Sequence, residues 1–108
     1  MTTYSLLHFT EGMDAQGVED YALRLEAMGY VRLWVPEVSG REPMALAGYL
    51  LARTSRINIG VGIANIYVRD YVAAAQARQT LAELSGGRFT LGLGVSHPML
   101  VEPRGHRF

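Results

Sequence analysis

The amino-acid sequence predicts an α/β fold built on a parallel sheet. Four short segments rich in leucine, aromatic and β-branched residues alternate with three segments that have the periodicity of amphipathic helices. The connections between successive strand segments are long enough for crossover helices, which join parallel strands with a right-handed turn. The composition, 49% hydrophobic and 19% charged residues, is that of an ordinary globular domain.

The first three strands are expected at residues 4–9, 32–36 and 57–63, and the fourth at residues 88–95. The first helix is expected between the first two strands, from residue 14 to residue 28. Asp14 suits the N-cap, and glycine at position 29 suits the position after a helix, where a positive φ is favoured. The predicted inward face of this helix comprises Val18, Tyr21, Ala22, Leu25 and Met28.

The second helix is expected to begin at Pro43, a residue that fits the first helical turn, and to end near Thr54. Its predicted inward residues are Leu46, Ala47, Leu50 and Leu51. The third helix is expected to follow Asp70 as N-cap and to end at the run of small residues 85–87. Its predicted inward residues are Ala74, Ala77, Leu81 and Leu84.

The spacing of these units matches a (β/α)8 TIM barrel of about 250 residues divided into eight modules. Four strands make half of such a barrel. We therefore expect residues 1–108 to form one partial barrel domain, equivalent to about the first four βα units of the N-terminal half.

Charge and composition exclude several classes of function. Ten basic residues, all arginine, balance ten acidic residues and form no run, so binding to nucleic acid or to an anionic membrane is not expected. The lack of cysteine excludes disulfides and thiolate metal sites. The N-terminus has no basic signal region, and no apolar stretch approaches the ~20 residues of a membrane span, so a cytoplasmic location is expected.

Two Gly-x-Gly patterns, at residues 60–62 and 92–94, differ from the dinucleotide-binding motif. Asn65 and His97 stand where that motif requires a small residue for helix packing. Two interpretations of the glycines remain open: tight packing within the strands, and close approach of a ligand.

Polar residues stand at the end of each predicted strand: His8, Glu37, Asn65 and the pair Ser96-His97. Active sites of parallel α/β folds gather at the carboxyl ends of strands, so these residues are expected to converge on one rim. Arg69 and Asp70 are interpreted as a capped helix start with an ion pair at this rim.

No metal site is expected. His97, Glu102 and His106 share no helical or strand spacing, and no fourth ligand accompanies them.

Two longer stretches carry a family resemblance. Residues 60–70, GVGIANIYVRD, are followed at helical distance by residues 80–94, TLAELSGGRFTLGLG, and this pairing resembles the luciferase-like monooxygenase family. Residues 27–30 and 33–37 are also similar to the end of that family's first helix and its second strand. The resemblance spans nearly the whole chain.

The resemblance implies an oxidoreductase that holds flavin mononucleotide (FMN) or the deazaflavin coenzyme F420 in the barrel mouth. The reaction implied is hydride transfer or oxygen-dependent oxidation of a small organic substrate. Deazaflavin is slightly preferred. Ten arginines without any lysine suggest a GC-rich coding sequence, which favours the actinobacterial, deazaflavin-dependent branch of the family. The expected catalytic residues are Glu37 and His97. The expected cofactor contacts are His8, Gly62, Ile63, Asn65 and Ser96.

The resemblance also implies a cis peptide bond between Gly62 and Ile63. This sequence departs from the family pattern in two ways. Many relatives have histidine after the acidic residue that ends the second strand, a natural proton-transfer group, where this sequence has Val38. Relatives also continue through four more βα units, and barrels commonly bind phosphate after strands seven and eight. Weak cofactor binding is therefore expected.

The alternative function is that of a catalytically silent half-barrel that self-associates through its open sheet edges.

Overall fold

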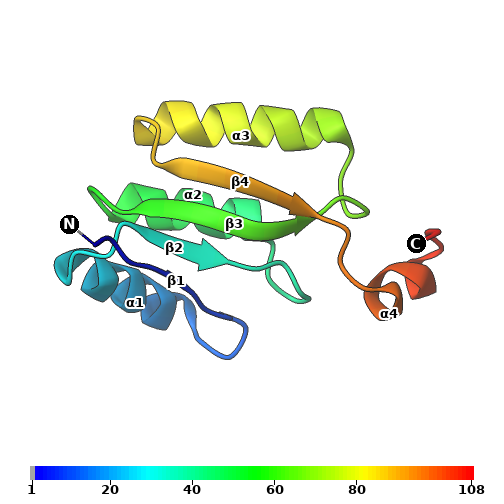
Figure 1. Ribbon diagram of the computed structural model, residues 1–108, viewed down its shortest axis with the longest axis horizontal. Coiled ribbons are helices and arrows are strands. Elements are labelled where there is room, and N and C mark those ends of the chain that lie inside the picture. Colours follow the sequence, from blue (N-terminus) through cyan, green and yellow to red (C-terminus); the bar gives the residue numbers. More distant parts are fainter. Residues whose placement is uncertain (1) are drawn as a thin grey trace.

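Four parallel strands form one sheet in sequence order (Figure 1). The computed structural model describes residues 2–108. The strands are β1 (Ser5–Leu7), β2 (Arg32–Val35), β3 (Asn58–Asn65) and β4 (Phe89–Gly94). Neighbouring strands pair in parallel throughout, with a bulge in β3 between Gly62 and Ala64. The expected strand order is therefore confirmed, although β1 is shorter than the predicted segment 4–9.

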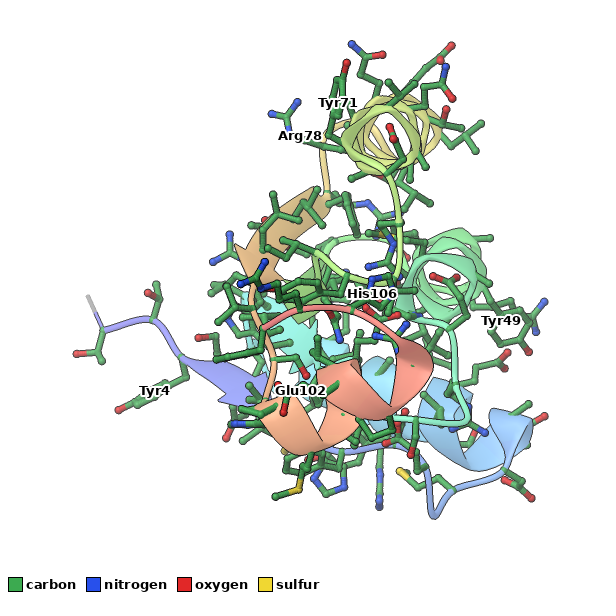
Figure 2. All side chains as sticks on the ribbon, turned by 90° about the vertical axis from the view of Figure 1, so that its right-hand side faces the viewer. Tyr4, Tyr49, Tyr71, Arg78, Glu102 and His106 are labelled. Atoms are coloured by element: carbon green, nitrogen blue, oxygen red, sulfur yellow. The ribbon has the colours of Figure 1, made fainter. Side chains whose placement is uncertain are left out.

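Three long helices cover one face of the sheet, as Figure 2 shows end-on. They are α1 (Ala15–Ala27), α2 (Pro43–Arg53) and α3 (Tyr71–Ser85). After β4 the chain forms a short helix, α4 (Pro98–Val101), and a 3₁₀ turn, η1 (Glu102–Arg104), which the sequence did not predict. Among residues 2–108, no helix has both the length and the apolar character needed to cross a membrane.

The helix boundaries follow the predicted end signals. The Asp14 carboxylate accepts a hydrogen bond from the Gly17 N–H at 2.7 Å, and Gly29 has a φ of 86° just after α1. The Asp70 carboxylate accepts from the Val72 N–H at 2.8 Å, which caps α3. At α2 the cap is Glu42, which accepts from the N–H groups of Met44 and Ala45.

The core lies between the sheet and the helices. Alternate strand residues point toward the helices and are buried, as for Leu33, Val35, Ile59 and Val61. The facing helix residues are Val18, Ala22, Leu25, Ala47, Leu50 and Leu81. The predicted inward faces of the three helices are therefore correct over most of their extent.

Two predicted core residues are wrong. Met28 is 65% exposed, because α1 ends at Ala27 and Met28 lies beyond the helical turn that faces the sheet. Leu84 is 78% exposed, because Ser85 takes the inward position at the end of α3. The Ser85 hydroxyl donates to the Leu81 carbonyl at 2.6 Å and accepts from the Arg88 N–H, which satisfies this buried polar side chain.

The opposite face of the sheet, which we call the open face, is dominated by one aromatic ring and several glycines. Trp34 lies there beside Gly60, Gly62 and Gly92. A Cβ added to Gly60 would lie 2.5 Å from Cε3 of Trp34, and one added to Gly62 would lie 2.8 Å from the same atom. Of the two interpretations of the glycines, packing therefore accounts for these positions.

Two charged side chains fasten the amino-terminal ends of the strands. Glu26 Oε2 accepts hydrogen bonds from three successive backbone N–H groups, those of Ser55, Arg56 and Ile57. Burial acts to raise the pKa of Glu26, but these N–H donors outweigh it and the pKa is lowered. Nearby, the Arg88 guanidinium donates to the carbonyls of Leu51, Thr54, Ile57 and Ser85.

Candidate functional site

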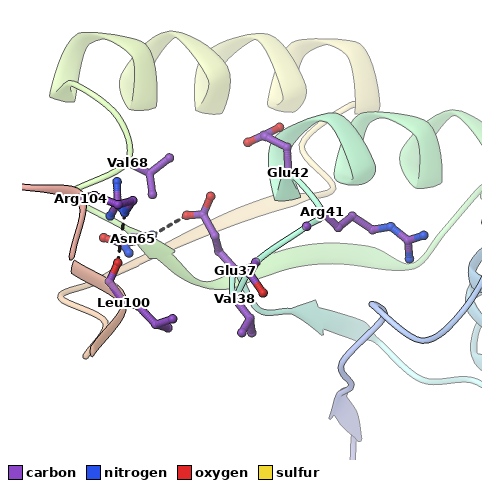
Figure 3. A pocket seen from close by; sticks show the side chains of 10 residues that line it. Glu37, Val38, Arg41, Glu42, Asn65, Val68, Leu100 and Arg104 are labelled. Atoms are coloured by element: carbon purple, nitrogen blue, oxygen red, sulfur yellow. Dashed lines mark hydrogen bonds between the residues drawn. The ribbon is translucent and has the colours of Figure 1, made fainter. Parts of the chain in front are cut away.

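A pocket of about 520 Å³ lies at the carboxyl ends of the strands (Figure 3). Its walls come from the segment after β2, the end of β3 and the α4–η1 segment. The lining residues are Glu37, Val38, Ser39, Gly40, Arg41, Glu42, Asn65, Val68, Leu100 and Arg104. This is the end of a parallel sheet at which active sites of such folds form.

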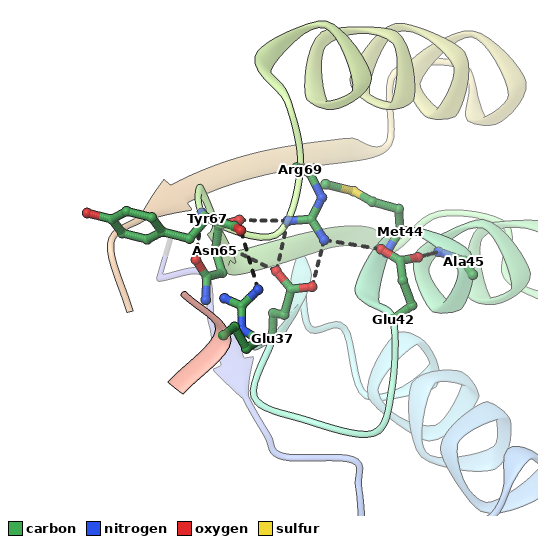
Figure 4. A network of polar contacts seen from close by, with 8 residues as sticks. Glu37, Glu42, Met44, Ala45, Asn65, Tyr67 and Arg69 are labelled. Atoms are coloured by element: carbon green, nitrogen blue, oxygen red, sulfur yellow. Dashed lines mark hydrogen bonds and ion pairs between the residues drawn. The ribbon is translucent and has the colours of Figure 1, made fainter. Parts of the chain in front are cut away.

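Glu37, which lines this pocket, forms an ion pair with Arg69, which lies behind the lining residues (Figure 4). The guanidinium contacts both carboxylate oxygens, with Nη1 2.8 Å from Oε1 and Nη2 2.6 Å from Oε2. The Asn65 N–H donates to Glu37 Oε1 at 2.7 Å. Arg69 Nη1 also donates to the Asn65 carbonyl, at 3.2 Å, so both residues hold the same point of the backbone.

The pair is largely withdrawn from solvent. The side chains of Arg69 and Glu37 are 10% and 9% exposed, respectively. Donation of hydrogen bonds to the Glu37 carboxylate raises the pKa of Arg69 above its ordinary value, although burial acts in the opposite direction. A second carboxylate, Glu42, lies 3.3 Å from Nη2 and is half exposed. Arg69 therefore remains a cation between two acids.

Ile63 follows the bulge in β3 and has the expected cis peptide bond to Gly62, so that prediction is confirmed. Its side chain is 38% exposed. A Cβ added to Gly94 would lie 2.7 Å from Ile63 Cδ1, so the absence of a side chain on β4 leaves room for Ile63. Ile63 is thus an exposed apolar side chain at the carboxyl end of β3.

The histidines lie farther out on the rim. The exposed His8 ring stacks on Tyr21 with 4.8 Å between ring centroids, while the His8 N–H donates to the Trp34 carbonyl. His97 is exposed and precedes α4, and Ser96 has a φ of 63°. Within the described chain, no hydrogen bond or ion pair joins His8 or His97 to Glu37. The structure thus brings Glu37 and Asn65 into contact, while His8, Ser96 and His97 do not line the pocket.

Sequence reasoning missed part of the site. Arg69 was interpreted as an ion-pair residue of the rim, but Glu37 was not identified as its partner, because 32 positions separate them. Leu100 and Arg104 were not considered as pocket residues. Arg104 donates to the carbonyls of Leu100 and Tyr67, which fastens the α4–η1 segment beside β3. The segment after β4 contains the apolar run PMLV of α4, with proline in its first turn, but this local pattern does not indicate that the segment packs beside β3.

Comparison with known proteins gives a consistent result. A family model described as luciferase-like monooxygenase matches residues 2–107. The 5,10-methylenetetrahydromethanopterin reductase of Methanolobus tindarius is 32% identical over 78 residues, which is 71% of this chain and 24% of that protein. The chain therefore spans about a quarter of this relative's length.

Solved structures share the fold. The coenzyme F420-dependent tetrahydromethanopterin reductase of Methanopyrus kandleri superposes with a TM-score of 0.88 and 22% identity, over 98% of this chain and 30% of that one. The oxygenating constituent of 3,6-diketocamphane monooxygenase from Pseudomonas putida, solved with FMN, gives a TM-score of 0.80 and 18% identity, over 97% and 33%. The predicted α/β arrangement of the TIM-barrel type is thus confirmed.

Proposed function

Because the chain belongs to the luciferase-like monooxygenase family, we propose that it supplies the part of an oxidoreductase that faces the ring of coenzyme F420 or FMN. One observation carries the proposal: the exposed apolar side chain of Ile63 and the pocket lined by Glu37 and Asn65 lie at the same carboxyl end of β3, where the Glu37 N–H donates to the Ile63 carbonyl. A flat, partly polar ring requires this combination of an apolar support and a few hydrogen-bonding groups.

The residues present fit such a ring. Gly94 on β4 has no side chain, and the place that a Cβ would take there is occupied by Ile63, so glycine at position 94 lets the Ile63 side chain lie against β4 and offer an apolar surface to the ring. Asn65 lines the pocket and presents an amide. The cofactor would supply the hydride-transfer or oxygen-dependent chemistry, and these residues would support and orient it.

His97 is the side chain of this rim best suited to move a proton to or from a small organic substrate. It is exposed, it lies at the end of the strand-to-helix connection after β4, and one imidazole nitrogen can donate a proton while the other accepts one. Ser96 and His8 would contact the bound molecules from the same rim. The comparisons support both F420 and FMN as candidates, because one neighbouring structure is named for each.

The proposal is tested by titrating the chain with F420, FMN and riboflavin and following the change in visible absorbance. We expect weak binding, with FMN and riboflavin bound within about threefold of each other, because charge-assisted bonds to a phosphate would otherwise separate them by tenfold or more. Ile63→Glu should abolish binding, and Ile66→Glu, at a residue of similar exposure, should not. Lack of any binding at millimolar concentration would rule the proposal out.

A second candidate function is self-association of a catalytically silent half-barrel. The observation that favours it is the exposure of both sheet edges: β1 pairs only with β2, and β4 only with β3. Leu7 on β1 and Leu93 on β4 are both more than half exposed. Sedimentation velocity should then show dimers or larger species that Leu93→Lys reduces and Leu23→Lys on α1 does not.

A further inference from the structure

The end of β3 is not held by a neighbouring strand on its β2 side. The ladder between these strands stops where Val35 pairs with Val61, whereas β3 continues to Asn65. Backbone groups of Ile63 and Asn65 on that side therefore need other partners, since buried N–H and C=O groups are almost always paired.

Glu37 supplies both partners from a single residue. Its backbone N–H donates to the Ile63 carbonyl at 3.2 Å, and its Oε1 accepts from the Asn65 N–H at 2.7 Å. Glu37 thus replaces β2 as the hydrogen-bonding partner of β3 beyond Val61. Its two bonds go to Ile63 and Asn65, the residues on either side of Ala64.

Arg69 fixes the orientation of that carboxylate. Its guanidinium bonds both Glu37 oxygens and also the Asn65 carbonyl, so it grips the carboxylate and the strand end together. Bidentate pairs of this kind add directional specificity to the attraction of charges. Oε1 accepts from the Asn65 N–H and from Arg69 Nη1, and Oε2 accepts from Arg69 Nη2. Both carboxylate oxygens of Glu37 are therefore bonded to donors of the chain itself.

We propose that Glu37 is a positioning residue that, with Arg69, sets the place of Ile63 and Asn65 relative to a bound ligand, and does not itself exchange a proton in the reaction. This inference rests on the proposed function for its ligand. It changes the role expected for Glu37, and it assigns a role to Arg69, which was expected only to form an ion pair. His97 is left as the proton-transfer candidate among the predicted catalytic residues.

The first test measures hydrogen exchange at the Asn65 amide by nuclear magnetic resonance, without ligand. Glu37→Gln should speed exchange at this amide by about tenfold, because the glutamine oxygen can accept only a weaker, uncharged hydrogen bond and its NH2 group cannot accept from Arg69. Glu42→Gln is the matched control: Glu42 contacts the same guanidinium but does not touch the β3 backbone, so exchange should stay within about twofold. Unchanged exchange in Glu37→Gln would overturn the inference.

The second test separates positioning from simple ion pairing. The double variant Glu37→Arg/Arg69→Glu keeps opposite charges at the two positions, but a guanidinium at position 37 has only donors and cannot accept from the Asn65 N–H. We expect folding stability to recover largely relative to Glu37→Gln, while the Asn65 amide stays exposed to exchange. Recovery of both would show that only the ion pair matters and would refute the positioning role.

The third measurement is affinity for F420 and FMN in the same variants. Glu37→Gln should weaken binding by roughly the factor by which Asn65 exchange speeds up, and Glu83→Gln, at an exposed acid of α3 outside the pocket, should leave it unchanged. If the wild-type chain binds and Glu37→Gln binds equally well, the positioning role for ligand is wrong. If the wild-type chain binds neither cofactor, the proposed function is wrong, and so is the claim that Glu37 positions residues for a ligand. The exchange data still decide whether Glu37 holds the end of β3.

Discussion

The indole ring of Trp34 lies so close to Gly60 that a Cβ on this glycine would come within 2.5 Å of ring atom Cε3. The Trp34 ring, on the neighbouring strand β2, therefore leaves room only for glycine at position 60. The Arg32 guanidinium lies over the same ring, with its central carbon 5.2 Å from the ring centroid, and Arg32 Nε donates to Asn58. The guanidinium therefore lies over the face of the ring, and Gly60 lies against carbons of its six-membered ring.

The first prediction concerns this contact. Gly60→Ala should lower the free energy of unfolding by about 1–3 kcal/mol, the usual cost of overpacking a closely packed site. Gly12→Ala, at a position with nothing within 4 Å of the added Cβ, should change it by less than about 0.5 kcal/mol. Urea unfolding measures both. In a Trp34→Leu background the cost of Gly60→Ala should largely disappear, and a cost that persists there would show that the backbone itself rejects alanine.

The second prediction concerns the buried ion pair. Arg69→Met should destabilise the fold by about 3 kcal/mol, because the Glu37 carboxylate would be left buried without its cation. The exposed arginine of the same neighbourhood in sequence, Arg78 on α3, provides the control, and Arg78→Met should be nearly neutral. The double variant Glu37→Leu/Arg69→Met should recover much of the loss. A double variant as unstable as Arg69→Met would contradict the electrostatic explanation.

The third prediction concerns Arg88, whose planar guanidinium ties β4 to the end of α2. Arg88→Lys should destabilise by about 2 kcal/mol or more, since an ammonium group cannot reproduce a fork that bonds Leu51, Thr54 and Ile57 at once. Arg78→Lys serves as the conservative exchange at an exposed site. Thermal unfolding monitored by circular dichroism is the appropriate measurement, and equal melting temperatures for the two variants would refute the prediction.

The fourth prediction concerns acid stability. The pKa of Glu26 is lowered from its ordinary value of 4.5 in the folded chain, so this carboxylate contributes stability that is complete above about pH 4.5 and is lost as the pH falls through the lower folded-state pKa. Glu26→Gln should therefore flatten the dependence of the urea midpoint on pH below 4.5. Glu83→Gln, at an exposed acid on α3, should keep the wild-type slope. Part of the slope should survive in both variants, because the pKa of Glu19 is also lowered, by hydrogen bonds from Tyr49 and Arg53.

The elements of the fold could be predicted because their signals are local. Asp14, Pro43 and Asp70 each mark a helix start within one turn of the residues that they cap, and alternation along β2 and β3 separates core residues from the open face. The pairing of Glu37 with Arg69 had no such signal. It depends on the spacing of β2 and β3 in the sheet and on where each strand stops.

Partners that are backbone groups were equally hidden from the sequence. Glu26 and Arg88 each serve several main-chain groups that lie about 30 positions away, and any sequence in those segments would present the same N–H and C=O groups. The rim residues were named correctly as the ends of strands. Which of them touch one another was a question of loop conformation, and only the contact between Glu37 and Asn65 is made.

Trp34 has one further consequence. It is the single tryptophan of the chain, and its ring lies on the open face between Arg32 and the glycines. Its ultraviolet fluorescence therefore originates from one known place on the sheet. Any molecule or strand that covers this face would change the polarity around the indole and shift its emission, and a flavin nearby would quench that emission by energy transfer. The fluorescence of Trp34 therefore reports on any molecule or strand that covers the open face of the sheet.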